Sequence, residues 1–156
     1  DTSIIANFEE LSSNTKVWDF SGYTTEVNTT KSGFTENYDG LTIAIANNGA
    51  DSDHDKITTA GVYWRGGAAS GESVRYIAFT PEKDGTLTAS GKMKTSGGRW
   101  GFSTSKDVGT LKADGSSSTS TSESTVTIQC TAGTTYYIIN KSKAATINNI
   151  SYTPSE

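Results

Sequence analysis

The chain has 156 residues, a formal net charge of −4, one cysteine and one histidine. This length suits one domain with its own hydrophobic core, and we expect a single domain over residues 1–156. A single cysteine excludes an intramolecular disulfide, and the absence of any run of about 20 apolar residues argues against a membrane-spanning helix or a membrane partner.

The composition is dominated by 25 Thr and 21 Ser residues, and charged residues are few. Such a composition is typical of the surface of an extracellular β-protein. We therefore expect a secreted protein. The chain begins at Asp1 without a charged and apolar leader, so we expect it to be part of a longer protein.

Short runs of alternating apolar and polar residues occur throughout, and no window has helical periodicity. This pattern predicts an all-β fold in which two antiparallel sheets form a jelly-roll-like β-sandwich. Turn residues at 82–85 and 96–98 predict a three-stranded meander in the middle of the chain. Segment 114–124 is a low-complexity Ser/Thr loop with nothing to bury, and we expect it to be mobile. The predicted strands are 4–9, 16–20, 41–46, 57–65, 72–80, 86–94, 99–103, 125–130, 135–140 and 146–153.

An acidic run precedes the strand at 57–65. Asp51, Asp53 and Asp55 alternate along the chain, and their carboxylate oxygens are ligands that Ca²⁺ prefers. The EF-hand pattern is not met, because Lys56 stands where that loop needs a glycine. A structural calcium site and a solvated acidic turn are the two interpretations.

The next candidate site is aromatic. Trp64 and Arg65 end a strand that runs into a glycine-rich loop, where a ring can be held open to solvent. Trp100 and Tyr136 lie in later strands, and an exposed ring at any of these positions would stack on a pyranose face. Burial in the core is the alternative for both tryptophans.

Positive charge is concentrated in the middle of the chain, where residues 65–112 carry 8 basic and 4 acidic side chains. Lys92 and Lys94 share the polar face of one strand about 7 Å apart, and Arg99 and Lys106 follow closely. We expect these four side chains to form one surface that pairs with the carboxylates of a polyanion. The alternative is that they only keep sheet edges soluble.

Catalytic residues are scarce. His54 is the only histidine, no Ser/His/Asp order can be built, and no pair of carboxylates across a cleft is apparent. We therefore expect no enzymatic activity and no required cofactor. The local charge of +4 on an acidic body also argues against a nucleic-acid partner.

Five short motifs carry a resemblance to a known class of domain. The motifs are Trp18-Asp19-Phe20, Gly40-Leu41-Thr42-Ile43, Arg75-Tyr76-Ile77-Ala78-Phe79, Asp84-Gly85-Thr86-Leu87-Thr88 and Tyr136-Tyr137-Ile138-Ile139-Asn140-Lys141-Ser142. They are similar to segments of the β-sandwich carbohydrate-binding modules attached to bacterial pectate lyases and pectin esterases, of the family 77 kind. The resemblance implies a non-catalytic module that keeps a covalently linked catalytic domain on pectin, with lysines contacting galacturonate carboxylates.

The leading hypothesis is therefore binding of an anionic plant cell-wall polysaccharide such as homogalacturonan. A second hypothesis is binding of a neutral β-glucan or xyloglucan through aromatic stacking. A third is a structural or adhesion module that only spaces other domains. A fourth is a small sandwich-fold lyase or hydrolase, which would need a matched acid and base.

Overall fold

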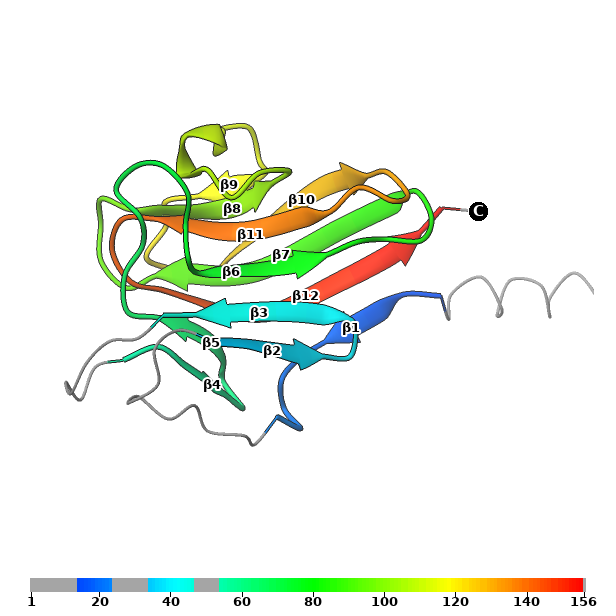
Figure 1. Cartoon of the computed structure of the whole chain (residues 1–156), viewed down its shortest axis with the longest axis horizontal. Helices are drawn as coiled ribbons and strands as arrows, with labels where there is room; N and C mark the ends of the chain where they lie inside the picture. Colours follow the sequence, from blue (N-terminus) through cyan, green and yellow to red (C-terminus); the bar gives the residue numbers. More distant parts are fainter. Residues whose placement is uncertain (1–13, 24–33, 47–53, 156) are drawn as a thin grey trace, which may run out of the picture.

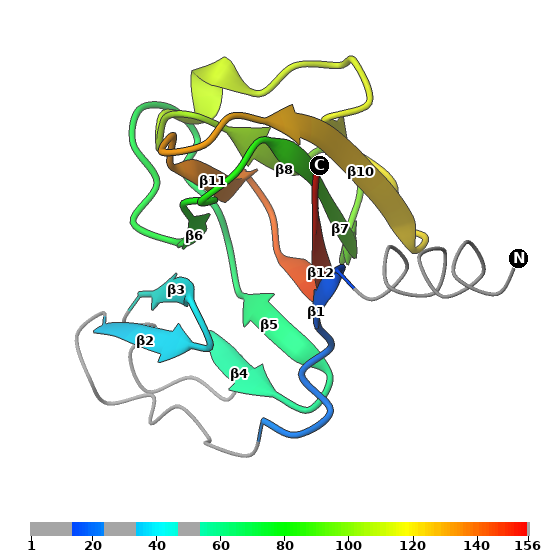
Figure 2. The ribbon, with the colours of Figure 1, turned by 90° about the vertical axis from the view of Figure 1, so that its right-hand side faces the viewer.

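The computed structural model describes residues 14–23, 34–46 and 54–155, and the predicted strand 4–9 lies outside them. The described residues form two six-stranded antiparallel sheets (Figure 1), so the predicted all-β sandwich is confirmed. Figure 2 shows the two sheets as separate layers. In these three segments, no helix has the length and apolar character needed to span a membrane.

The first sheet has the strand order β10-β7-β12-β5-β4, and β1 also pairs with β12. The second sheet has the order β2-β3-β6-β11-β8-β9. In the first sheet the strands are β1 (Lys16–Trp18), β4 (Lys56–Thr58), β5 (Gly61–Trp64), β7 (Gly85–Met93), β10 (Ser124–Cys130) and β12 (Ala145–Pro154). In the second sheet they are β2 (Phe34–Tyr38), β3 (Leu41–Ile45), β6 (Tyr76–Phe79), β8 (Arg99–Ser103), β9 (Ser117–Ser118) and β11 (Tyr136–Lys141).

Consecutive strands in the middle of the chain alternate between the sheets. Strands β6 and β8 belong to the second sheet, whereas β7 lies between β10 and β12 in the first. The predicted meander is therefore wrong. The turn residues correctly mark chain reversals, but the returning strand crosses the core instead of pairing with the strand before it. At the crossing, a Cβ on Gly98 would clash with Met93 and with the Ser142 carbonyl, so this position requires glycine.

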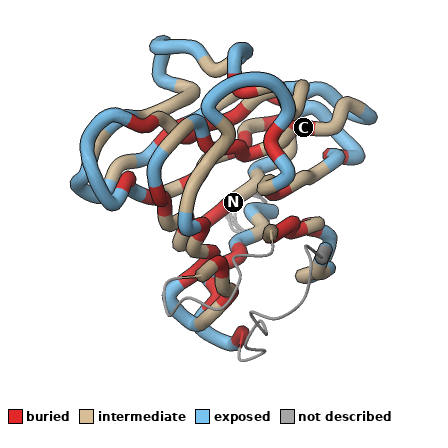
Figure 3. Tube along the Cα trace, turned by 60° about the vertical axis from the view of Figure 1, so that its left-hand side comes forward, coloured by how far each residue is buried: buried red, intermediate tan, exposed pale blue. Residues whose placement is uncertain are grey.

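The core lies between the sheets, and Figure 3 shows buried segments along the strands with exposed loops around them. Strand β7 alternates as its sequence predicts, with Leu87 and Ala89 buried and Lys92 exposed. Indole groups link the two layers. The Trp64 Nε1 group donates a hydrogen bond of 3.2 Å to the Ala44 carbonyl, which belongs to the second sheet.

The Ser/Thr-rich segment 114–124 has more structure than its composition predicts. It contains β9, which pairs with β8, and the Ser120 carbonyl accepts a hydrogen bond of 2.9 Å from the Met93 amide. Serine hydroxyls at 118 and 120 accept hydrogen bonds from the amides two residues further along. Part of this segment therefore pairs into the second sheet and is supported by local side-chain to backbone bonds, and its expected mobility stays a prediction.

Candidate functional site

The predicted aromatic platforms are buried. Trp64 and Trp100 are both 0% exposed, because strand alternation turns their rings toward the opposite sheet. Tyr136 is only 8% exposed, and its hydroxyl oxygen accepts a hydrogen bond from the Thr131 amide. The prediction that a sugar stacks on Trp64 or Trp100 is therefore wrong, whereas Tyr136 keeps a small exposed area that lines a pocket.

The predicted cluster of four cations is divided between the two sheets. Lys92 lies in β7 of the first sheet and Lys94 follows that strand. Arg99 lies in β8 of the second sheet and donates a hydrogen bond to the Ser117 hydroxyl. The Lys106 ammonium lies 4.5 Å from the ring centre of Tyr76, which is also in the second sheet. The prediction that all four residues form a single surface is therefore wrong, because the chain crosses the core between β7 and β8.

Half of that cluster takes part in a different arrangement on the outer face of the first sheet. Tyr63 pairs with Lys56 on one side and with Thr146 on the other, and Thr146 in turn pairs with Lys92. The four residues thus form one row across β4, β5, β12 and β7. Since neighbouring strands lie about 5 Å apart, the row spans roughly 15 Å. Its side chains face outward, because Ile57 and the other neighbours along each strand are buried.

Two ammonium groups surround the Tyr63 ring. Nζ of Lys56 lies 5.4 Å from the ring centre, and Nζ of Lys94 lies 5.7 Å from it. Lys94 also donates a hydrogen bond of 3.4 Å to the Tyr63 hydroxyl. Cation–π attraction holds both lysines beside the ring. Arg65, exposed and directly after β5, adds a further positive charge. We call Lys56, Tyr63, Arg65, Lys92 and Lys94 the Tyr63 patch.

Asp55, on the core side of the first sheet, holds the strands that carry this patch in place. Its side chain is buried, and Oδ2 accepts hydrogen bonds from Arg75 Nε at 2.7 Å and from the Ala46 amide at 2.9 Å. Oδ1 accepts a bond of 2.8 Å from the Arg65 amide. The carboxylate therefore ties the beginning of β4 to the end of β5 and to the end of β3.

These bonds correct the calcium prediction for Asp55, because both of its oxygens are already held by protein donors. Asp51 and Asp53 lie outside the described residues, and a calcium site there stays a prediction. Within residues 14–23, 34–46 and 54–155, no group of three or more potential metal ligands comes together.

Polar side chains continue from the patch along the same face of the first sheet. Hydroxyl pairs bridge β7 and β10, from Thr88 to Thr127 at 3.2 Å and from Ser90 to Thr125 at 3.0 Å. Glu123 precedes β10 near Lys92 and accepts two hydrogen bonds from the Asn148 amide group. This face therefore offers a basic end, an acidic neighbour and a long stretch of hydroxyl groups.

Sequence reasoning missed the roles of Lys56 and Tyr63. Lys56 precedes the predicted strand 57–65 and Tyr63 lies within it. This segment is in fact a hairpin of β4 and β5 with a turn at Thr59 and Ala60. The turn signal is weak apart from Gly61, whose φ of 111° requires glycine. Recognising a hairpin there would have placed Lys56 and Tyr63 side by side.

No family model matches this chain, and no curated protein matches it. Solved structures with a similar strand arrangement include one from the Ruminococcus flavefaciens cellulosome, described for glycan recognition, with 18% identity, a TM-score of 0.39 and coverage of 91% of this chain and 95% of that chain. The C-terminal family 6 carbohydrate-binding module of the laminarinase LamC from Zobellia galactanivorans has 14% identity, a TM-score of 0.37 and coverage of 90% and 99%. A family 35 module from Paenibacillus barcinonensis has 17% identity, a TM-score of 0.36 and coverage of 93% and 96%. At these scores and identities the similarities establish neither a family nor a ligand for this chain.

Proposed function

We propose that this chain is a secreted, non-catalytic module that binds an anionic plant cell-wall polysaccharide of the pectin class through the Tyr63 patch. In this proposal it holds a covalently linked enzyme on its substrate. The observation that carries the proposal is that Lys56 and Lys94 flank a partly exposed tyrosine ring, with Lys92 in the same cross-strand row and the exposed Arg65 directly after β5, on the outer face of the first sheet.

The geometry of the patch suits a long polyuronate chain. A flat sheet face accepts an extended polymer anywhere along its length, whereas a narrow pocket accepts only an end. A chain lying across β4 to β7 meets Lys56 at one end of the row and Lys92 at the other, with the Tyr63 ring between them. Ammonium groups then pair with the uronate carboxylates, and the ring contacts a pyranose face.

The affinity expected from these contacts is modest. Each exposed ion pair contributes about 0–1 kcal/mol, so three or four pairs contribute at most about 4 kcal/mol, which corresponds to a dissociation constant in the millimolar range that the ring contact lowers further. Such binding depends on several weak contacts acting together. It therefore weakens when salt screens the charges.

The test compares two triple variants that remove the same total charge. Lys56→Ala/Lys92→Ala/Lys94→Ala removes the patch, and Lys83→Ala/Lys141→Ala/Lys143→Ala removes three exposed lysines elsewhere. Affinity electrophoresis in de-esterified homogalacturonan should show retention of the wild type and the control triple, and at least about tenfold weaker retention of the patch triple. Equal loss in both triples would mean that only net charge matters, and this would contradict the proposal.

The same gels separate the other hypotheses. Retention in a neutral glucan gel that is insensitive to salt and to the patch triple would favour aromatic recognition of a neutral polymer. Retention in no gel of a panel of pectins, xylans and glucans would favour a spacer module. Release of shorter sugars from any of these polymers by the purified chain would reveal a catalytic activity.

A further inference from the structure

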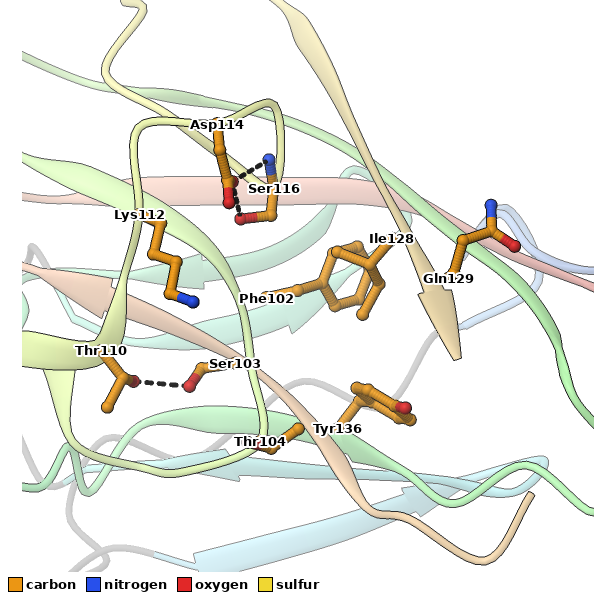
Figure 4. Close-up of a pocket in the computed structure, with 10 residues that line it drawn as sticks. All are labelled: Phe102, Ser103, Thr104, Thr110, Lys112, Asp114, Ser116, Ile128, Gln129 and Tyr136. Atoms are coloured by element: carbon orange, nitrogen blue, oxygen red, sulfur yellow. Dashed lines mark hydrogen bonds between the residues drawn. The ribbon is translucent and has the colours of Figure 1, made fainter. Parts of the chain in front are cut away.

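A pocket of about 410 Å³ opens between the edges of the two sheets, away from the Tyr63 patch (Figure 4). Residues of β8, β10 and β11 line it, together with the segment that leads from β8 to β9. The pocket lies near the C-terminal end of β10, whereas Glu123 and the patch lie near its N-terminal end. The length of β10, about 20 Å, therefore separates the two regions.

The inner wall of the pocket is aromatic and aliphatic. Phe102 is 5% exposed, Tyr136 is 8% exposed, and Ile128 is partly buried against the same core. The Tyr136 hydroxyl oxygen accepts from the Thr131 amide, which leaves its own hydrogen for another acceptor. Such a wall suits the C–H groups of a sugar ring.

The opposite wall is polar and is held in place by its own hydrogen bonds. Ser103 and Thr110 pair through their hydroxyl groups. Lys112 is fixed through its carbonyl oxygen, which accepts from the Ser117 hydroxyl. Figure 4 shows Lys112 and Asp114 on the side of the pocket that faces Phe102.

Asp114 is an ionised acceptor on this wall. Its Oδ1 accepts hydrogen bonds from both the hydroxyl and the amide of Ser116. The hydroxyl bond is the main reason why the pKa of Asp114 lies below its ordinary value, and the nearby Lys112 charge adds to the effect. Because Lys112 and Asp114 carry opposite charges, the pocket as a whole is neutral.

We propose that this pocket is a second glycan site, which takes one or two neutral sugar units at a chain end or side branch. Its volume lies in the lower part of the range of small-molecule sites, about 300–1,000 Å³. It combines hydroxyl and ammonium donors with a carboxylate acceptor, which is the mixture that sugar hydroxyl groups require. Because Lys112 and Asp114 cancel, the pocket lacks the net positive charge that favours a uronate at the Tyr63 patch. The inference stands independently of the function proposed for that patch.

The experiment is a titration of the ¹⁵N-labelled chain with cellotriose, xylotriose, mannotriose and galactotriose, and separately with trigalacturonate, followed by amide chemical shifts. At least one neutral trisaccharide should shift the amides of Ser103, Lys112 and Ser116. Thr104→Trp, which places an indole at the pocket mouth, should abolish these shifts. Asp114→Asn, which keeps the size of the side chain, should weaken binding about tenfold.

Two controls keep the result specific. Glu82→Gln changes an exposed acid elsewhere and should leave the neutral sugar titration unchanged. The Lys56→Ala/Lys92→Ala/Lys94→Ala variant should also leave it unchanged. Absence of pocket shifts with all four neutral sugars, or their persistence in Thr104→Trp, would overturn the proposal. The amides of Lys56, Tyr63 and Lys92 report the trigalacturonate titration in the same spectra, so failure of either site is seen separately.

Discussion

The Tyr63 patch and the pocket between the sheet edges are built by the same sandwich in opposite ways. The patch lies on a flat outer face, and its side chains come from three strands of one sheet and the segments that follow them. The pocket is concave and lies where strands of both sheets end in a hydrogen-bonded loop. The patch has an excess of positive charge, whereas Lys112 and Asp114 cancel in the pocket.

This difference separates two kinds of recognition. A flat charged face attracts a polyanion at long range and tolerates many registers, so its contacts are weak and sensitive to salt. A concave neutral pocket relies on short-range hydrogen bonds, which depend on geometry and are insensitive to screening. Variants that affect one region and spare the other therefore test each assignment.

The largest expected effect is a loss of unfolding free energy when Asp55, which holds the strands of the patch together, is replaced. Asp55→Ala leaves the Arg75 guanidinium and two amides without their acceptor, and breaking a buried ion pair in this way costs about 3–5 kcal/mol of unfolding free energy. Chemical denaturation measures this loss. The matched control is Asp39→Asn, which tolerates the positive φ of 49° at this position and removes the ion pair with the exposed Lys16, with an expected loss of about 0–1 kcal/mol. Similar losses for both variants would show that Asp55 is not the anchor.

The next effect concerns the ring itself. Tyr63→Ala should weaken homogalacturonan binding about tenfold, because it removes the stacking surface and the group that holds Lys56 and Lys94. Tyr63→Phe keeps the ring and loses the bond from Lys94, so it should bind within about twofold of wild type. Calorimetry measures both. Equal losses for the two variants would rule out stacking on the ring.

Salt should sharpen the comparison further. Raising ionic strength from about 0.01 M to about 1 M shortens the screening length from roughly 30 Å to roughly 3 Å. Trigalacturonate binding at the patch should then weaken several-fold, and neutral trisaccharide binding in the pocket should stay constant. Parallel titrations at the two ionic strengths provide the measurement. Polyuronate binding that is indifferent to salt would exclude the lysine mechanism.

The smallest effect is expected from pH. The pKa of Asp114 is lowered from its ordinary 3.8, mainly by the Ser116 hydroxyl bond, so the carboxylate stays ionised throughout mildly acidic solution. Neutral sugar binding and any stabilisation from this bond should therefore be unchanged between about pH 7 and pH 5 and fall only as the pH drops through the lowered pKa. Titrations across this range measure the dependence. A decline that begins near neutrality would indicate that another group controls the pocket.

The sequence predicts the fold class and one face of β7 correctly, because both depend on the alternation of neighbouring residues. It does not predict which strands share a sheet. The turn before Arg99 looks the same whether the chain returns as a hairpin or crosses the core, and only the second case separates Arg99 and Lys106 from Lys92.

The patch illustrates the same difficulty. Its row joins four strands, and the alignment of Thr146 with both Tyr63 and Lys92 lies next to a register shift between Ile147 and Asn149. Such a register depends on long-range pairing, which local patterns do not encode. Burial and exposure of Trp64 and Trp100 stay open from the sequence for a related reason, since the inward face of β5 and β8 is known only once the opposite sheet is placed.

Amide chemical-shift mapping with trigalacturonate tests the central assignment most directly. The expected result is a continuous set of shifted amides over β4, β5 and the end of β7, centred on Tyr63, which the Lys56→Ala/Lys92→Ala/Lys94→Ala variant removes. Shifts confined to the second sheet around Lys106 and Tyr137, with β4 and β5 unaffected, would contradict it.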